Sequence, residues 1–263
     1  MDAPTRLPTL FLSHGSPMLA IEASDAGRFL DGLGRQLPWP RAIVIASAHF
    51  ETTRPTLGGH PSPRTVHDFH GFPQALSRID YPAPGAPDLA EQVCKRLADA
   101  GFDPVIRHDN GLDHGAWVPL LRMYPQTDVP VLPVSVMPRQ SASVHFELGR
   151  ALAPLRGEGV LVIGSGGFVH NLGEIDWRQS DAAPAPWALQ FAEWMHERIA
   201  AADWPALLQW REQAPQAARA HPTPEHLLPL FFAIGAAGVD ACARVIHRSS
   251  QFGSLALDAI AFD

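Results

Sequence analysis

The stretch Thr9–Pro17, TLFLSHGSP, joins a short apolar run to a tight turn that carries a histidine. An apolar run of this length, bounded by Pro on one side and by Gly and Ser on the other, is typical of a buried strand. Three further runs, rich in β-branched residues, have the same character: Ala42–Ala46, Val129–Val136 and Val160–Ile163. We therefore expect a sheet that is buried on both faces.

Amphipathic segments with helical spacing lie between these runs, at Asp88–Ala100, Ser143–Leu155 and Trp187–Ala201. The C-terminal part adds a predicted helix and two predicted strands, at His226–Ala236, Ala241–His247 and Ser254–Ala259. Strands that alternate with helices predict an α/β fold, and the C-terminal strands make a mixed sheet the expectation. Since no linker or repeat divides the chain, we expect residues 1–263 to form a single catalytic domain of three layers, a central mixed sheet flanked by helices.

The composition narrows the classes of function. Hydrophobic residues make up 46% of the 263 residues, the formal net charge is −7, and the Lys and Arg residues are scattered, so nucleic acid is not an expected partner. No apolar run approaches the roughly 20 residues that span a bilayer, and Met1–Pro8 lacks the pattern of a secretory leader. These features predict a cytoplasmic protein that does not enter membranes. Cys94 and Cys242 have no metal-type spacing, and we expect both to be buried small hydrophobes.

The chain contains 13 histidines, and three of them follow apolar runs. His14 follows the first predicted strand, His49 the second, and His170 comes shortly after Val160–Ile163 and a Gly-rich segment. We expect Gly164, Gly166 and Gly167 in that segment to let the backbone approach a substrate closely. In open α/β sheets, ligands bind beyond the carboxyl ends of the strands, so these three side chains are expected to converge on one site. A single histidine at a strand end is more often an ordinary hydrogen-bonded side chain, but three at equivalent places point to a shared function.

The segment His221–His226, HPTPEH, precedes an apolar helix. Pro224 suits the first turn of that helix and Thr223 its cap, so His226 would project from the helix start and complete a metal shell. Three protein ligands with open positions mark a catalytic site, and neutral imidazole suits zinc and iron(II) alike. Glu225 and His221 remain alternative ligands or partners of the ligands.

Two further segments carry candidate substrate residues. His114 lies in a loop before the apolar segment Val118–Met123, where a role as proton carrier or substrate contact and a role as an ordinary solvent-facing side chain carry equal weight. The aromatic loop that contains His67, Phe69 and His70 could wall a flat substrate.

Six motifs in order resemble the class III extradiol ring-cleavage dioxygenases of the LigB-like superfamily, in particular their DOPA 4,5-dioxygenase branch. The motifs are SHGSP, SAHF, HDFHGFP, LDHGAWVPL, GSGGFVHNL and HPTPEH, and they run from about Leu10 almost to the C-terminus. One local departure is His70, where relatives more often carry Gly or Tyr.

The resemblance implies a mononuclear metal, iron(II) in the active enzyme and zinc in some isolated preparations, held by His14, His49 and His226. It also implies that His170 is the general base and that His114 contacts the substrate. From the residues themselves we further expect Ser16, in the tight turn beside His14, and the loop residues His67, Phe69 and His70 to bind the substrate. The implied reaction opens the ring of a catechol with O₂ and gives a ring-opened semialdehyde.

A zinc hydrolase that uses the same histidines is the main alternative, and a binding protein on the same fold is the non-enzymatic one. Metal identity and O₂ uptake separate the first from a dioxygenase. The sequence leaves open which catechol is used, and it is compatible with a homo-oligomer.

Overall fold

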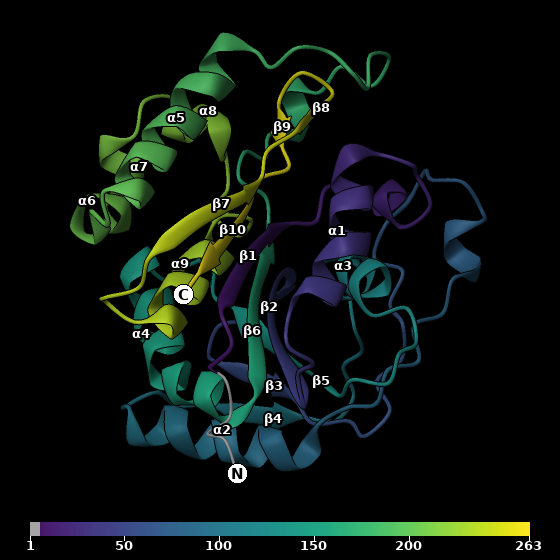
Figure 1. Cartoon of the computed structure of the whole chain (residues 1–263), viewed down its shortest axis with the longest axis vertical. Helices are drawn as coiled ribbons and strands as arrows, with labels where there is room; N and C mark the ends of the chain where they lie inside the picture. Colours follow the sequence, from purple (N-terminus) through teal and green to yellow (C-terminus); the bar gives the residue numbers. More distant parts are fainter. Residues whose placement is uncertain (1–5) are drawn as a thin grey trace.

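The computed structural model describes residues 6–263, and its centre is a mixed sheet of eight strands (Figure 1). In spatial order these are β4 (Val105–Arg107), β3 (Thr56–Gly58), β5 (Val131–Val136), β2 (Ala42–Glu51), β6 (Val160–Gly166), β1 (Thr9–Ser13), β10 (Ala259–Phe262) and β7 (Ala243–His247). The four central strands, β5, β2, β6 and β1, are parallel, whereas β10 runs antiparallel to β1 and β3 antiparallel to β5. The predicted α/β fold with a mixed sheet is confirmed.

Helices cover both faces of this sheet (Figure 1). One face carries α1 (Asp25–Gln36) and α3 (His114–Met123); the other carries α2 (Pro87–Asp99), α4 (Ala142–Leu152) and α9 (Leu228–Ala237). Successive side chains of β2 alternate between these layers: Ile43 packs with the first pair of helices and Val44 with the second group. This alternation is the two-residue period of a strand, and it explains why β2 is apolar at every position from Ala42 to Ala46.

A smaller helical layer packs against the outer side of α9 and the C-terminal strands. It consists of α5 (Pro186–Ala200), α6 (Trp204–Leu208), α7 (Trp210–Gln213) and α8 (Ala217–Ala220). Beside it lies a two-stranded hairpin of β8 (Ser250–Gln251) and β9 (Leu255–Ala256). Four 3₁₀ helices complete the described elements: η1 (Pro17–Ala20), η2 (Leu76–Arg78), η3 (Ala153–Glu158) and η4 (Leu172–Glu174).

Several element boundaries differ from the sequence prediction. The predicted strand Ser254–Ala259 is correct only at Leu255–Ala256, which forms β9 of a hairpin, and the strand of the main sheet begins only at Ala259. Strands β3 and β4 were not predicted; each has only three residues, too few to show a period. The helix expected from His226 starts at Leu228, with Pro229 in its first turn. Thr223 therefore does not cap it, and the Thr223 hydroxyl donates instead to Glu225 Oε1 at 2.8 Å.

Other expectations concern the surface and the ends of the chain. Cys94 is only partly buried and Cys242 is exposed, so the expectation that both are buried is wrong. Among residues 6–263, no helix is both long and apolar enough to cross a membrane. Met1–Thr5, part of the segment in which no leader was expected, lie outside the described residues.

Candidate metal centre and substrate cavity

Three neighbouring parallel strands bring three histidines to one edge of the sheet. Strands β1, β6 and β2 are adjacent, and their registers align Ser13 with Gly166 and Ser47 with Ser165. His14 follows β1 directly, and its backbone N–H donates to the Gly166 carbonyl at 2.9 Å. His49 lies inside β2 rather than after it, because this strand continues to Glu51. His170 follows the end of β6 by four residues, and it lines the same cavity as His14 and His49. The predicted convergence at the carboxyl ends of the strands is therefore present in the structure.

The fourth histidine, His226, reaches the site because β6 has glycines, Gly164 and Gly166, at the positions that the turn before α9 crosses. A Cβ atom on Gly166 would overlap the His226 carbonyl oxygen, and one on Gly164 would overlap the carbonyl oxygen of Pro229. The amide of Gly167 donates to the His226 carbonyl at 2.9 Å. Gly164 and Gly166 were expected to admit a substrate, but they admit another segment of the chain instead.

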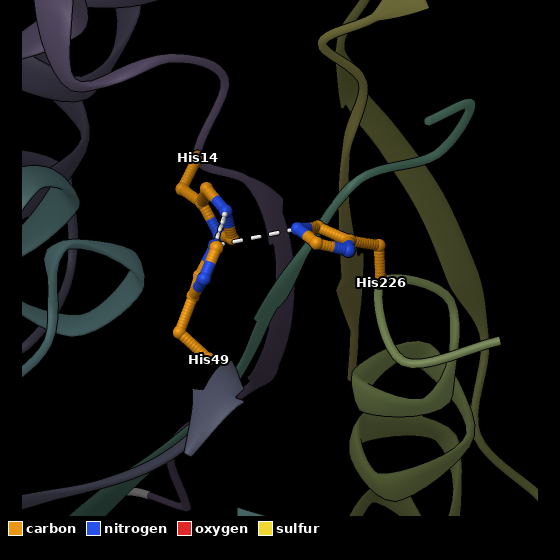
Figure 2. Close-up of side chains that lie close together, drawn as sticks. All are labelled: His14, His49 and His226. Atoms are coloured by element: carbon orange, nitrogen blue, oxygen red, sulfur yellow. Dashed lines mark hydrogen bonds between the residues drawn. The ribbon is translucent and has the colours of Figure 1, made fainter. Parts of the chain in front are cut away.

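His14, His49 and His226 point their Nε2 atoms at one another (Figure 2). The Nε2 atom of His49 lies 3.1 Å from that of His14 and 3.3 Å from that of His226. His14 and His226 are 1% and 5% exposed. Three ring nitrogens from three chain segments thus meet at one buried point.

The opposite nitrogen of each ring faces an oxygen that fixes its proton. The Ser165 hydroxyl donates to the Gly115 carbonyl, so its oxygen accepts from His14 Nδ1 at 3.1 Å. Carboxylate oxygens face the other two Nδ1 atoms, Glu225 Oε1 at 3.0 Å from His226 and Asp68 Oδ2 at 3.5 Å from His49. We therefore assign the proton to Nδ1 in all three rings, which leaves a lone pair on each Nε2.

These lone pairs fit a metal ion. Burial, followed by the neighbouring imidazoles, holds the pKa of His14 and of His226 well below the usual range, and burial lowers the pKa of His49 to about 3. Three neutral rings whose Nε2 lone pairs face one another cannot form hydrogen bonds with one another, because none of these nitrogens carries a proton to donate. Two nitrogens bound at about 2.1 Å and at right angles on one ion would be about 3.0 Å apart, close to the separations seen here. Imidazoles oriented through their far nitrogen are the usual arrangement around a metal.

His114 is the first residue of α3, not a loop residue as predicted, and it lies beside the three rings. Its ring centroid is 3.9 Å from that of His49 and 5.3 Å from that of His14. Its backbone N–H donates to Asp68 Oδ1 at 2.9 Å, and its Nδ1 lies 3.0 Å from the same oxygen without the alignment of a hydrogen bond. Burial raises the pKa of Asp68, but the contacts with His114 outweigh it and lower this pKa to about 2.

The start of α3 is held by a buried carboxylate. Asp113 caps the helix by accepting from the Ala116 N–H at 3.2 Å, and it also accepts from the Ser47 hydroxyl. Burial raises the pKa of Asp113 to about 6. Asp113 therefore fixes α3 against β2 and so places His114.

His170 stacks on His226, with ring centroids 3.4 Å apart and planes inclined by 7°. Burial lowers the pKa of His170 to about 4, so the ring is neutral at pH 7. Its backbone N–H donates to the Ala220 carbonyl at 3.0 Å, while its imidazole lies on the wall of a cavity. A neutral imidazole in such a place is able to accept a proton from a bound molecule.

An open cavity of about 1100 Å³ lies above the histidines. Ser16, Phe69 and His70 line it, as the sequence led us to expect. His67 does not: its Nε2 lies 3.0 Å from the Ile79 carbonyl oxygen, and its ring packs behind Phe69. The expectation that His67 contacts the substrate finds no support in this position.

Of the two alternative ligands, His221 lies apart and Glu225 lies beside the cluster. The buried His221 directs Nε2 to the Phe168 carbonyl at 3.1 Å and packs between Phe191 and Trp210. Glu225 contacts the Nδ1 atom of His226, on the side of the ring away from the other two imidazoles.

Sequence reasoning missed several residues of the site. Asp68, Ser47 and Ser165 hold the histidines, and Trp177 and Phe252 line the cavity. Asp68 lies within a quoted motif, and Ser47 and Ser165 alternate with core residues on strands that were predicted. These three residues could therefore have been identified from the sequence. Trp177 and Phe252 come from loops in which the sequence shows no pattern.

Comparison with known proteins gives a consistent result. The family model described as the catalytic LigB subunit of aromatic ring-opening dioxygenase matches residues 8–256. Two similar proteins are both named 4,5-DOPA dioxygenase extradiol. The one from Beta vulgaris is 39% identical over 97% of this chain and 96% of its own length. The one from Escherichia coli (strain K12) is 40% identical over 96% of this chain and 93% of its own.

Among solved structures, that of an uncharacterized protein from Escherichia coli K12 is similar, with a TM-score of 0.83 and 33% sequence identity. The similarity covers 98% of this chain and 100% of that one.

Proposed function

The chain belongs to the family of the catalytic LigB subunit of aromatic ring-opening dioxygenases, and we propose that it is an extradiol dioxygenase, an oxidoreductase that opens the ring of a catechol with O₂. The observation that carries the proposal is the meeting of three imidazole Nε2 atoms below an open cavity. The similarity to proteins named 4,5-DOPA dioxygenase supports a DOPA-like catechol as substrate and a ring-opened semialdehyde as product.

His14, His49 and His226 are the proposed metal ligands. Their unprotonated Nε2 atoms and oriented Nδ1 atoms support this role. We propose iron(II) as the metal of the active enzyme, while zinc would fit the same ligands without supporting the reaction, because it has no redox chemistry. When bound, a redox-active ion with three protein ligands offers open positions to a catechol and to O₂.

The remaining histidines act on protons and on substrate position. His170 lies against His226 on the cavity wall, where an imidazole nitrogen is available to take a proton from a catechol hydroxyl and later return it. The Nδ1 side of His114 faces Asp68, which leaves the other side of its ring for a substrate oxygen. Glu225 holds the ring of His226 in place through Nδ1.

The zinc hydrolase is no longer favoured. It would use the same ligands, but the family and the relatives named above are dioxygenases. No observation among the described residues favours hydrolysis over ring opening.

The test is anaerobic reconstitution with iron(II), followed by O₂ uptake and absorbance scans with DOPA, protocatechuate and plain catechol. We expect O₂ consumption coupled to a yellow ring-opened product. His170→Ala should lower kcat by about 10²-fold or more while metal content stays unchanged, because proton transfer of this kind contributes about 10² to 10⁴ in rate.

His60→Ala is the matched control, since His60 is outside the cavity and accepts a hydrogen bond from the Ser62 amide. Its activity should equal that of the unmodified protein. Iron-loaded protein that consumes no O₂ with any catechol would refute the proposed function, and equal activity of the two variants would refute the role of His170.

A further inference from the structure

His221 is a buried imidazole that the proposed function does not use. It is 0% exposed, and its ring lies between the rings of Phe191 and Trp210, at centroid distances of 5.4 Å and 5.6 Å. Burial lowers the pKa of His221 to about 3, so the side chain is neutral at pH 7. A polar ring in such apolar surroundings costs free energy unless its nitrogens form hydrogen bonds. The bonds of this ring therefore indicate its role.

One ring nitrogen of His221 forms a hydrogen bond and the other does not. The Nε2 atom lies 3.1 Å from the Phe168 carbonyl oxygen, and since a carbonyl only accepts, we assign the proton to Nε2. The Nδ1 atom is buried without a hydrogen-bond partner among residues 6–263. A leucine would fill a similar volume without burying that nitrogen, so packing alone does not explain an imidazole here. What distinguishes the imidazole from an apolar side chain is the bond that it donates to Phe168.

This bond joins the segment that carries His170 to the segment that carries His226. The hydrogen bonds that cross between the two segments include Gly167 N–H to the His226 carbonyl (2.9 Å), His221 Nε2 to the Phe168 carbonyl (3.1 Å) and His170 N–H to the Ala220 carbonyl (3.0 Å). Of these three, only the bond from His221 comes from a side chain. It is therefore the one that a substitution can remove without a change in the backbone.

The turn between β6 and His170 is held at Phe168 from both sides. The Phe168 N–H donates to Ser13 Oγ at 3.1 Å, and the Phe168 carbonyl accepts from His221. The guanidinium of Arg211 donates in turn to the His221 carbonyl, which fixes the backbone of the donor residue. Loss of the bond from His221 would release one of the two sides, two residues before His170.

His170 and His226 depend on this bond to different degrees. The ring of His170 is positioned by its backbone and by its stack on His226, with centroids 3.4 Å apart and planes inclined by 7°. The ring of His226 is also fixed by Glu225 at Nδ1, and its carbonyl packs against Gly166. Removal of the bond from His221 should therefore displace His170 more than His226.

We infer that His221 is a positioning residue, which holds the loop that carries His170 against the segment that carries His226 and so keeps the proposed base stacked on a proposed metal ligand. Its importance for catalysis rests on the proposed function, in which His170 is the base, whereas its hold on the backbone follows from the contacts alone. A reacting group that is misplaced by about 1 Å can lower a rate by about 10²-fold, so this hold matters for proton transfer.

The test compares three substitutions of His221. His221→Leu has no donor, and the amide of His221→Asn is too short to reach Phe168, whereas the amide nitrogen of His221→Gln can take the place of imidazole Nε2. In iron-loaded protein with DOPA, the Leu and Asn variants should lower kcat by about tenfold to a hundredfold, while KM and the dissociation constant for Zn²⁺ change by less than about threefold. His221→Gln should recover most of the lost kcat.

His145→Leu is the matched control. His145 is also 0% exposed and its ring also bonds to the backbone, at the Met137 amide, but it lies outside the cavity. The same substitution there should lower the melting temperature and leave kcat unchanged. All variants are assayed well below their melting temperatures, so that unfolding does not contribute to the rates.

A double variant tests whether His221 acts through His170. In the His170→Ala background, His221→Leu should have no further effect on kcat, because the group that it positions is already absent. An equal loss of kcat in both backgrounds would overturn the inference, and so would a loss of Zn²⁺ affinity as large as the loss of kcat, since His221 would then act through His226.

Crystal structures of the zinc-loaded variants provide a readout that needs no turnover. The centroid distance between His170 and His226 should increase from 3.4 Å by about 1 Å in His221→Leu and His221→Asn, and stay near 3.4 Å in His221→Gln. If the Leu and Asn variants leave the stack unchanged, or leave kcat unchanged in an active enzyme, the inference is overturned and the dioxygenase stands. If iron-loaded protein opens no catechol but both variants displace His170, the proposed function fails and the positioning by His221 stands.

Discussion

Gly166→Ala tests whether the metal site depends on close packing of the turn before α9 against β6. The added Cβ would overlap the backbone carbonyl oxygen of His226, and a backbone atom cannot rotate away as a side chain can. Overpacking of this kind typically costs about 1–3 kcal/mol. For a chain of this size, about 2 °C of melting temperature is lost per kcal/mol, so a decrease of about 2–6 °C is expected.

Gly157→Ala is the matched control. Gly157 is exposed in η3, has no atom within 4 Å of an added Cβ, and does not have a positive φ. The same substitution there should stabilise the fold by about 0.4–1 kcal/mol, because it restricts the unfolded chain. The two variants therefore should differ in the sign of their effect.

The assay is thermal unfolding of the metal-free proteins, followed by calorimetric titration with Zn²⁺. Displacement of His226 should also raise the dissociation constant for Zn²⁺ by about tenfold or more in Gly166→Ala, since small errors in ligand position commonly have this effect. If Gly166→Ala is as stable as Gly157→Ala and binds Zn²⁺ equally well, the packing of His226 against β6 does not control the site and the reasoning fails.

Three further predictions concern residues that hold the fold or the site. Ser165→Ala removes the acceptor for His14 Nδ1 and should weaken Zn²⁺ binding by about 10–100-fold, measured by competition with a chelator; unchanged affinity would show that this hydrogen bond does not orient the ring. Burial lowers the pKa of His145 to about 4, and its Nε2 accepts from the Met137 amide. Between about pH 4 and the usual histidine pKa of about 6.5, this side chain is protonated in the unfolded chain but not in the folded one. The free energy of unfolding therefore decreases as pH falls through this window. In urea unfolding at pH 7 and pH 5, the loss of free energy of unfolding at the lower pH should be about 2 kcal/mol smaller in His145→Gln than in the unmodified protein. Equal losses in the two proteins would show that His145 does not cause the acid destabilisation. Arg156→Met removes the guanidinium that donates to the buried carbonyl oxygens of Leu7, Ala237 and Phe262, of which Ala237 keeps a second donor in Arg6, and should lower the free energy of unfolding by about 2–3 kcal/mol. A change under about 1 kcal/mol would mean that water replaces the guanidinium.

The central strands could be predicted because burial on both faces leaves a simple pattern. Val160–Ile163 and Ala42–Ala46 are apolar at every position, and both lie in the middle of the sheet. The strand predicted at Ala241–His247 corresponds to β7, but the last strand of the sheet could not be placed in the same way. Ala259–Phe262 is a strand because it fits between β1 and β7, a contact between distant parts of the chain that local pattern does not record. The buried Asp258 before it is paired with His196, which is likewise a tertiary contact.

The part of the candidate site that lies at the ends of strands could be predicted from the sequence. Topology brings the carboxyl ends of parallel neighbours together, so His14 and His49 could be paired before the structure was known. The same argument gives no distance between rings and no proton positions. These depend on Ser165, Asp68 and Glu225, whose partners are set by packing.

At the glycines before His170, the close approach was predicted correctly, but the group that approaches them was not. Gly164 and Gly166 do mark a close approach at the edge of the sheet, but the approaching group is the chain's own backbone at Pro229 and His226. A small residue indicates that something lies near it and does not identify what that is. Here the close approach delivers the last ring of the histidine cluster. Substitution at these glycines should therefore disturb stability and metal binding together.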